Sequence, residues 1–354
     1  MTDERKKEFS GRAILRWALA GIALYIGAGW LGHKFFGQSI EEHLRNIILF
    51  VGGGIGLAIA ARRAQAADEQ AGAAQKQAEQ QSRQVENVSR QIEISEQGQI
   101  TERFTRAIEQ LGSDKLFLRV GAIAALERIG RDSKDDVLTV LNLLSGFVRE
   151  NSPVKAPSNK QPNPPPLDIL ECVYALSRLA RQYDSFLKNK DFRVDLSKTE
   201  LPYMESPEGA CFAHFDFSNS NLPHGRFFNI KCNGVWFEKT NLANANFKMG
   251  TLSRANFSFA NLAGTTFASV DLSCARFREA NLTKVRFSDS TLDFASFREA
   301  DMTGVNLLSS WCNKTWFTQA KNITTKMLSD IRFHERTPPE NIPEGIELPN
   351  PIDA

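Results

Sequence analysis

The sequence has almost no excess of either charge. Its 354 residues include 43 Lys and Arg against 41 Asp and Glu, which leaves a formal net charge of +2 at pH 7. This balance gives no global reason to expect a nucleic-acid binder or an acidic mimic of nucleic acid. Hydrophobic residues make up 42% of the chain and charged residues 24%, so the chain is neither wholly disordered nor a polytopic membrane protein. Its length predicts two or three folded units.

Motifs of catalysis and metal binding are also missing. The sequence contains no Gly-x-Ser-x-Gly elbow, no Walker phosphate loop, no His-Glu-x-x-His pair and no Cys-x-x-Cys pair. No spacing typical of metal ligands joins the histidines and cysteines, which are His33, His43, His214, His224, His334, Cys172, Cys211, Cys232, Cys274 and Cys312. We therefore predict that the protein is not an enzyme and has no cofactor and no metal site.

Aromatic residues other than phenylalanine are scarce. Phenylalanine occurs 25 times, whereas tyrosine occurs 4 times and tryptophan 5 times, as expected if one kind of buried slot is filled repeatedly. Large apolar residues, with two cysteines among them, recur every five positions at Phe212, Phe217, Leu222, Phe227, Cys232, Phe237, Leu242, Phe247, Leu252, Phe257, Leu262, Phe267, Leu272, Phe277, Leu282, Phe287, Leu292, Phe297, Met302, Leu307, Cys312 and Phe317. A period of five fits neither a helix nor an ordinary strand, so the chain must turn a corner in every repeat.

The other positions of the repeat are also patterned. A small or β-branched residue stands two positions before nearly every slot, and the residue between them is often Asn, as in residues 255–259 (Ala-Asn-Phe-Ser-Phe) and 260–264 (Ala-Asn-Leu-Ala-Gly). In this pattern the chain resembles the pentapeptide repeat family. The resemblance implies a right-handed quadrilateral β-helix with four repeats per coil, in which the large and small residues of each repeat point inward.

A longer period of twenty residues supports the same fold. Slots twenty positions apart would stack on one face, so that phenylalanine ladders oppose each other and leucine ladders oppose each other. The repeat core is predicted to contain Phe217, Leu222, Phe227, Phe237, Leu242, Phe247, Leu252, Phe257, Leu262, Phe267, Leu272, Phe277, Leu282, Phe287, Leu292 and Phe297. The 22 slots from Phe212 make about five and a half coils, or roughly 26 Å at about 4.8 Å per coil.

The two ends of the β-helix have their own signals. The step from Leu201 to Phe212 is eleven residues rather than ten, so one extra residue is expected to bulge out between Met204 and Gly209. We assign the β-helix to residues 191–320. Residues 321–354 are assigned to a C-terminal cap and tail, in which a short helix capped by Ser or Thr would cover the last coil.

The first part of the chain predicts a membrane hairpin in residues 1–63, with spans at about 13–32 and 44–61. A cleaved signal peptide for the first run and a buried helix for the second are the alternatives. Lys and Arg precede the first run, flank the second and are sparse between them, at Arg5, Lys6, Lys7, Arg12, Lys34, Arg45, Arg62 and Arg63. The positive-inside rule then places both chain ends in the cytoplasm of a bacterial cell, with the hairpin in the inner membrane. Gly52 and Gly56 have the spacing that lets membrane helices approach closely.

The middle of the chain reads as helical. Residues 64–99 are rich in Ala, Gln and Glu and form a predicted stalk, which is either a solvated single helix or a weak coiled coil for self-association. Residues 100–150 predict three amphipathic helices broken at residues 112–114 and 130–132, and this segment is similar to the helical module that precedes the repeats in many membrane-associated bacterial members of the family. A Pro-rich linker (151–167) and a helix that caps the first coil (168–190) complete a mixed, multi-domain fold.

The predicted function follows from these parts. Some members of the family mimic DNA, but residues 194–320 contain twelve acidic and twelve basic residues, so we expect no mimicry and no nucleic-acid partner. The leading hypothesis is a membrane-anchored scaffold whose cytoplasmic β-helix binds an unidentified protein partner, with self-association through the stalk or the rod left open. The alternative is a membrane effector in which the two-span hairpins oligomerise into a pore or disrupt the inner membrane.

Overall fold

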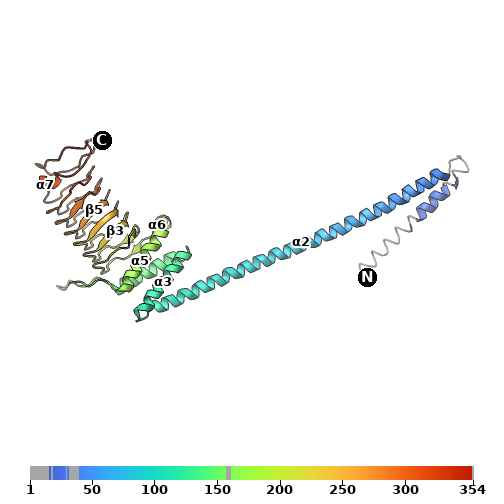
Figure 1. The fold of residues 1–354 in the computed structure, drawn as a ribbon, viewed down its shortest axis with the longest axis horizontal. Coiled ribbons are helices and arrows are strands. Elements are labelled where there is room, and N and C mark those ends of the chain that lie inside the picture. The colour runs from blue at the N-terminus through green and yellow to red at the C-terminus, as the bar shows by residue number, and fades with distance from the viewer. Residues whose placement is uncertain (1–15, 17–18, 29, 32–39, 157–160, 353–354) are drawn as a thin grey trace. The chain divides into compact units, whose positions relative to one another are not determined.

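The computed structural model describes the chain except for residues 1–15, 17–18, 29, 32–39, 157–160 and 353–354 (Figure 1). The chain divides into two compact units, Met1–Glu96 and Gln97–Ala354. The basic residues predicted before the first apolar run lie outside the described residues, as do Lys34 and parts of the first predicted span.

Two helices form the described part of the N-terminal unit. The shorter comprises Leu19–Ala28, and the longer, α2, begins at Ile40 and continues without interruption to Leu111 in the C-terminal unit. The two helices lie next to each other, because a small space between them is lined by Gly21, Ile22, Tyr25, Ile47, Phe50 and Val51. Within the described residues, one helix, Leu44–Leu111, contains a stretch long and apolar enough to cross a membrane.

The continuity of α2 differs from the sequence prediction. The second apolar run, the stalk and the first helix of the predicted module are one helix of 72 residues. The physical reason is that residues 64–99 contain no proline and are mostly strong helix formers, so nothing ends the helix before Gly112. The stalk side chains Val85, Val88 and Ile92 are exposed, so a coiled coil would need a second copy of the chain and stays a prediction.

A small bundle of helices follows α2 in the C-terminal unit. It comprises α3 (Leu116–Asp132), α4 (Val137–Asn151), α5 (Leu167–Gln182) and the short α6 (Asp184–Asn189), with the first three packed against one another. The break predicted at residues 130–132 is wrong, because these residues belong to α3. A Cβ atom on Gly130 would lie 3.3 Å from Val140 and Leu179 side-chain atoms, so this glycine permits close helix packing instead of ending the helix.

Two ion pairs join α3 to α5 across the bundle. Arg119 Nε donates to Asp168 Oδ2 at 2.6 Å, and the Asp168 side chain is only 5% exposed. Arg178 binds both carboxylate oxygens of Glu127 at 2.7 Å. Because bidentate and partly buried pairs hold a fixed geometry, these contacts set how the two helices lie against each other.

The β-helix begins directly after α6. Its strands are β1 (Val194–Asp195), β2 (Phe215–Asp216), β3 (Arg226–Lys231), β4 (Asn246–Thr251), β5 (Thr266–Asp271) and β6 (Arg286–Ser288). Strands β3 to β6 form one parallel sheet in which each residue pairs with the residue twenty positions later. This register confirms the coil of four pentapeptides.

The start of the β-helix keeps a different register. Val194 pairs with Phe215 and Glu205 with Arg226, both twenty-one positions apart, whereas Cys211 pairs with Lys231 at twenty. The extra residue therefore lies between Glu205 and Cys211, as the step of eleven in the sequence predicted.

The interior of the rod is built from the predicted slots. All sixteen predicted core residues are 2% exposed or less. The phenylalanines of one face stack from Phe217 to Phe317 with ring centroids 4.9–5.3 Å apart, and those of the opposite face stack from Phe227 to Phe287 at 4.5–5.1 Å. Rings of the two ladders also meet edge to face, for example Phe257 and Phe267 at 5.8 Å.

The corners of the coil lie two positions after the slots. Nearly every such residue from Lys239 to Gln319 has a positive φ, such as 61° at Arg254 and 71° at Gly264. This conformation is sterically unfavourable for residues other than Gly, Asn and Asp. The buried small positions add hydrogen bonds between coils: Thr240 Oγ1 donates to the Phe217 carbonyl at 2.6 Å, which satisfies a hydroxyl in the core.

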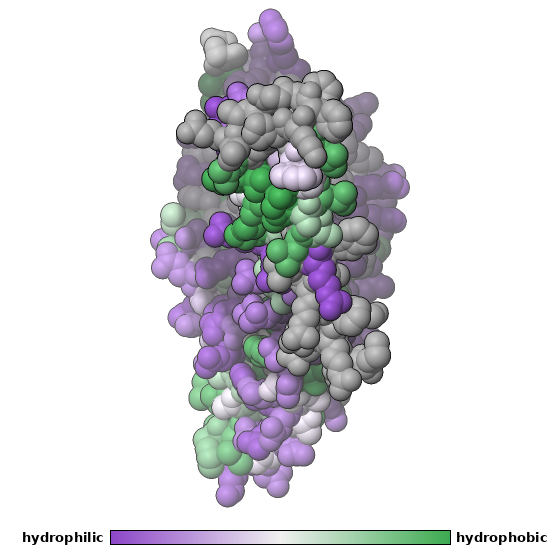
Figure 2. Space-filling model, turned by 90° about the vertical axis from the view of Figure 1, so that its right-hand side faces the viewer, coloured by the Kyte–Doolittle hydropathy of each residue, from purple (hydrophilic) through white to green (hydrophobic). Residues whose placement is uncertain are grey.

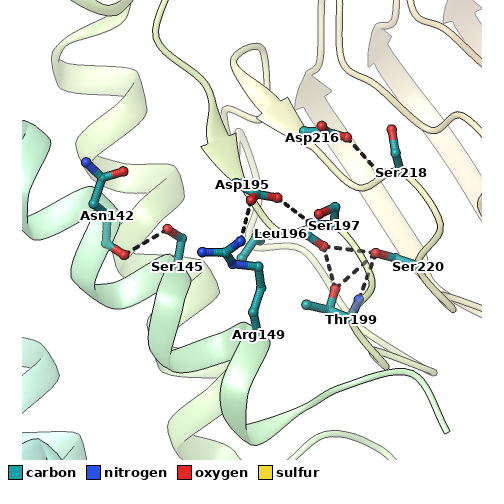
Figure 3. Close-up of polar contacts among 10 residues, drawn as sticks. All are labelled: Asn142, Ser145, Arg149, Asp195, Leu196, Ser197, Thr199, Asp216, Ser218 and Ser220. Carbon is teal, nitrogen blue, oxygen red and sulfur yellow. Dashed lines mark hydrogen bonds and ion pairs between the residues drawn. The ribbon is translucent and has the colours of Figure 1, made fainter.

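The N-terminal edge of the rod is covered by the helical bundle. Arg149 of α4 pairs with Asp195 of β1, and Asp195 also accepts a hydrogen bond from the Ser197 backbone at 2.9 Å (Figure 3). Residues 152–154 then run antiparallel to the first coil, where Pro153 pairs with Thr199. Tyr174 of α5 donates to the Glu205 carbonyl at 2.7 Å. The segment that the sequence assigns to a linker thus supplies the edge strand.

The C-terminal edge is covered by the end of the chain. Helix α7 (Thr325–Leu328) is capped by the Thr324 side chain, which accepts from the Met327 backbone N–H, and it buries Leu328. Beyond it, Arg332 pairs with Trp311, and Glu340 with Trp316. The short helix predicted from residues 324–331 is present, but much of the edge is covered by extended chain rather than by the helix.

The ladder packing leads to a stability prediction. We expect Phe257→Ala to lower the free energy of unfolding of the rod by about 3–5 kcal/mol, because the rings above and below are held by their own coils and cannot fill the cavity. Arg254→Ala, at an exposed corner of the same coil, should change it by less than about 0.5 kcal/mol. Urea unfolding of the full chain, followed by circular dichroism, measures both. Equal losses would contradict the inward and outward assignment.

Candidate functional site

A hollow lies on one outer face of the β-helix. It has a volume of about 680 Å³ and is lined by Glu238, Asn256, Ser258, Phe259, Cys274, Ala275, Arg276, Arg278, Phe294, Ser296, Arg298 and Trp316. Apart from the buried Ala275, these residues lie on the outside or at the corners of the face whose inside carries the phenylalanine ladder from Phe217 to Phe317. We call this surface the hollow face.

The hollow arises from the sizes of side chains on neighbouring coils. One outward position of the face forms a ladder in which Trp236 pairs with Asn256, Asn256 with Arg276, Arg276 with Ser296, and Ser296 with Trp316. Within this ladder the short side chains of Asn256 and Ser296 alternate with the larger side chains of Trp236, Arg276 and Trp316. Ser258, on the next outward position, is also short. The backbone is regular here, so the depression is made by side chains alone.

Two phenylalanines stand at corners beside the hollow. Phe259 is 40% exposed and Phe294 is 45% exposed, although the core positions of the rod bury phenylalanine completely. Both residues have a positive φ, of 61° and 59°, a conformation that is unfavourable for a bulky side chain. The positive φ is shared by the other corners of the coil, so it is the exposure of the two aromatic rings that distinguishes these positions.

Three arginines give the hollow a positive charge. Arg276, Arg278 and Arg298 against Glu238 leave a net charge of +2 among its lining residues. Arg278 contacts Glu279 at 3.0 Å and Arg298 contacts Glu299 at 2.9 Å, but these pairs are exposed and such pairs are weak. The Arg276 guanidinium has no hydrogen-bond or ion-pair partner among the described residues.

The aromatic and basic side chains also touch one another. The Arg278 guanidinium lies 5.7 Å from the centre of the Phe259 ring, and the Lys239 ammonium lies 5.8 Å from it. Both distances are within the range of cation–π contacts. At the other end, the Trp316 indole N–H donates to Glu340 Oε2 at 2.8 Å, so the C-terminal segment fixes this ring.

On a second face of the rod the outward side chains bond mainly to one another. Its outward asparagines form a chain of amide hydrogen bonds, from Asn281 to Asn261 at 3.1 Å, from Asn261 to Asn241 at 3.0 Å, and from Asn241 to Asn221 at 2.6 Å. Glu200 accepts from Asn221 and ends the ladder. On this face the amides bond to one another, whereas on the hollow face the Arg276 guanidinium has no partner in the part of the chain that the structure describes.

The cysteines divide into buried and exposed ones. Cys172, Cys211, Cys232 and Cys312 are buried, and Cys274 is exposed beside the hollow. Burial raises the pKa of the Cys211 and Cys232 thiols, and it raises that of Cys312 to about 12. These thiols therefore stay protonated at neutral pH and pack as small hydrophobic residues.

The candidate residues predicted from the sequence do not line the hollow. The predicted repeat core lies beneath the hollow face and supports it. Gly52 and Gly56 have no atom within 4 Å of where a Cβ would be, so they do not pack against another of the described helices, and their role stays a prediction. The sequence analysis did not predict the hollow. Its signal is visible in the sequence once the period of twenty is applied to the outward positions, where aromatic residues and arginines replace the usual Asn, Ser and Thr.

The exposure of Cys274 gives a second prediction. In the folded full chain at pH 7.5, a maleimide should modify Cys274 rapidly, because its side chain is open to solvent, while the four buried thiols react only after unfolding. Mass spectrometry of tryptic peptides after a short pulse measures each site. Cys274→Ser should abolish the rapid phase and serves as the control. Equal labelling of Cys232 or Cys312 would contradict the packing of the core.

A comparison with known protein families identifies the repeat. The sequence model of the family described as pentapeptide repeats matches residues 251–289 and 271–308, in eight copies. No match was found among curated proteins.

Solved structures of pentapeptide repeat proteins are similar to part of the chain. HetL, from the cyanobacterium Nostoc sp. strain PCC 7120 and involved in heterocyst differentiation regulation, is 15% identical, with 45% of this chain and 80% of HetL covered and a TM-score of 0.24. For trypsin-treated QnrB1, a plasmid-mediated fluoroquinolone resistance protein, the identity is 16%, the coverage 40% and 78%, and the TM-score 0.23. A thylakoid-lumen protein of Arabidopsis thaliana is 23% identical, with coverage of 33% and 74% and a TM-score of 0.13. The matched repeats and the coil of twenty residues show that residues 251–308 carry pentapeptide repeats.

Proposed function

We propose that this protein is a non-enzymatic scaffold, anchored in the bacterial inner membrane by its N-terminal unit, whose β-helix binds a protein partner on the cytoplasmic side. The observation that carries the proposal is the hollow face. Arginine and tryptophan are the residues most enriched at the energetic centres of protein interfaces, and here they surround a depression on a rigid rod. The pentapeptide repeat fold, which presents regular outer faces, suits an interaction role.

Exposed apolar side chains support the membrane part of the proposal. In the N-terminal unit the exposed large hydrophobic residues include Leu19, Leu24, Ile26, Trp30, Leu31, Leu44, Ile48, Leu49, Phe50, Ile55, Leu57 and Ile59. Figure 2, which views the molecule from the right-hand side of Figure 1, shows hydrophobic residues gathered on the face toward the viewer. A helix that is apolar on all sides and unburied within its own chain needs another apolar environment, and a bilayer provides one.

The distribution of basic residues supports the orientation. Lys and Arg are concentrated before the first apolar run and at Arg62 and Arg63 after the second, with few between the runs. This asymmetry favours a cytoplasmic location for both ends. The pore alternative gains no support from the described contact between the two apolar helices, because that contact contains no ionisable carboxylate or amine to line an ion path.

The topology gives the third prediction. A reporter fused after Ala64 should be active only as a cytoplasmic fusion, and a reporter placed at Gln38, which lies outside the described residues, should be active only outside the membrane. The full chain should resist carbonate extraction from membranes, and a chain that lacks residues 1–63 should be released. As a control, Phe257→Ala changes only the rod and should leave membrane retention unchanged.

Two results would contradict the proposal. A cytoplasmic signal from the Gln38 fusion would exclude the hairpin. Carbonate-soluble full chain would exclude integral anchoring, and neither result would bear on the hollow face.

A further inference from the structure

We infer that the hollow face binds an acidic segment of a protein partner, in which carboxylates meet Arg276, Arg278 and Arg298 and an apolar side chain lies between Phe259 and Phe294. The inference rests on the proposed function, because it names the chemistry of the partner that the scaffold would hold.

The arrangement of charge is the first step of the argument. Arg276 and Arg278 project outward from the same coil, and Arg298 lies one coil beyond Arg278, about 4.8 Å away along the rod. Like charges at neighbouring cross-strand positions destabilise a sheet. The described residues of the rod supply Glu238, Glu279 and Glu299 against this cluster. Glu279 and Glu299 are bound to the arginine next to them in the chain, and Glu238 accepts a hydrogen bond from Asn256 at 3.4 Å, so none of the three is paired with Arg276. An incoming carboxylate would relieve repulsion that the fold leaves in place.

The shape and apolar content of the hollow are the second step. Its volume of about 680 Å³ lies within the roughly 300–1,000 Å³ of sites that hold small ligands. It is therefore suited to a few side chains of an extended segment rather than to a whole folded surface. The exposed rings of Phe259 and Phe294 offer apolar contact on both sides of the arginines, so a segment that combines Glu or Asp with one large apolar residue matches the site.

Charge distribution distinguishes a protein segment from a nucleic acid. Single strands bind to continuous basic grooves with aromatic stacking platforms. Here Glu238, Glu279 and Glu299 lie in or beside the hollow, and the rod as a whole carries equal numbers of acidic and basic residues. A phosphate backbone that ran beyond the hollow would meet no basic track, whereas a short acidic segment needs none.

The test uses the full chain in detergent and a defined probe. The probe is a fluorescein-labelled peptide, Glu-Glu-Trp-Glu-Glu-Leu-Glu, and fluorescence anisotropy at low ionic strength measures its binding. The same peptide with Lys in place of Glu and a ten-nucleotide oligo-dT are the comparison ligands. We expect the acidic peptide to bind and both comparison ligands to bind at least about tenfold more weakly.

Variants assign the binding to the hollow. Arg276→Glu with Arg298→Glu should weaken peptide binding by about tenfold or more. The matched control is Lys248→Glu with Arg286→Glu, which makes the same change of charge at exposed outward positions of the opposite face and should leave binding within about twofold. Circular dichroism of both double variants verifies that the rod is folded.

A second measurement does not depend on charge reversal. Because Cys274 lines the hollow, bound acidic peptide should slow its modification by maleimide at saturating peptide concentration, and the lysine peptide should not. The inference is overturned if the acidic peptide shows no preference over the lysine peptide, if both double variants lose binding equally, if oligo-dT binds more tightly, or if Cys274 is not protected. Each of these results is independent of membrane retention, which tests the anchor.

Discussion

Backbone hydrogen bonds between residues twenty positions apart are the constraint on which this protein depends. They require coils of the same length. Within residues 194–321 one insertion, between Glu205 and Cys211, displaces the register by one residue at the start of the rod. Equal coils place like side chains on top of one another, so the phenylalanines stack with centroids about 5 Å apart. The core is thus a consequence of the register, and the register is reinforced by the stacking, because a shifted coil would bring a phenylalanine over a small residue.

This coupling explains why the rod could be predicted from the sequence and the helical part only partly. Each inward slot from Phe217 to Phe297 has to satisfy the same packing, so the pattern is repeated often enough to define the coil, the faces and the buried residues. Helix boundaries carry no such repetition. Gly130 has the residue type of a helix end, yet it lies where α3 touches α5 and only its missing side chain matters. Residues 152–154 have the composition of a linker, but they pair with the otherwise unpaired edge of the first coil.

The hollow face could not be predicted in the same way, because the outward positions of a β-helix are free of the packing constraint. Asn, Ser and Thr at these positions bond to their neighbours in adjacent coils, as the ladder from Asn221 to Asn281 does. Arg276, Phe259 and Phe294 have no comparable role within the rod. A surface that keeps unpaired charge and exposed rings lowers the stability of the isolated chain, and the phenylalanine core is strong enough to tolerate that cost.

The covered ends of the rod decide where a partner can bind. Coil edges carry free N–H and C=O groups and invite strand addition or end-to-end stacking of rods. Here residues 152–154 and α4 occupy the first edge, while Arg332 and Glu340 pair with the last coils and Ile352 pairs with His334 beyond them. A protein partner of the kind proposed above would therefore approach from the side, where the four faces differ in their outward side chains. Because the backbone of every face is nearly the same, recognition of such a partner would depend on the outward residues that depart from the repeat pattern, as Phe259, Arg276 and Phe294 do on the hollow face.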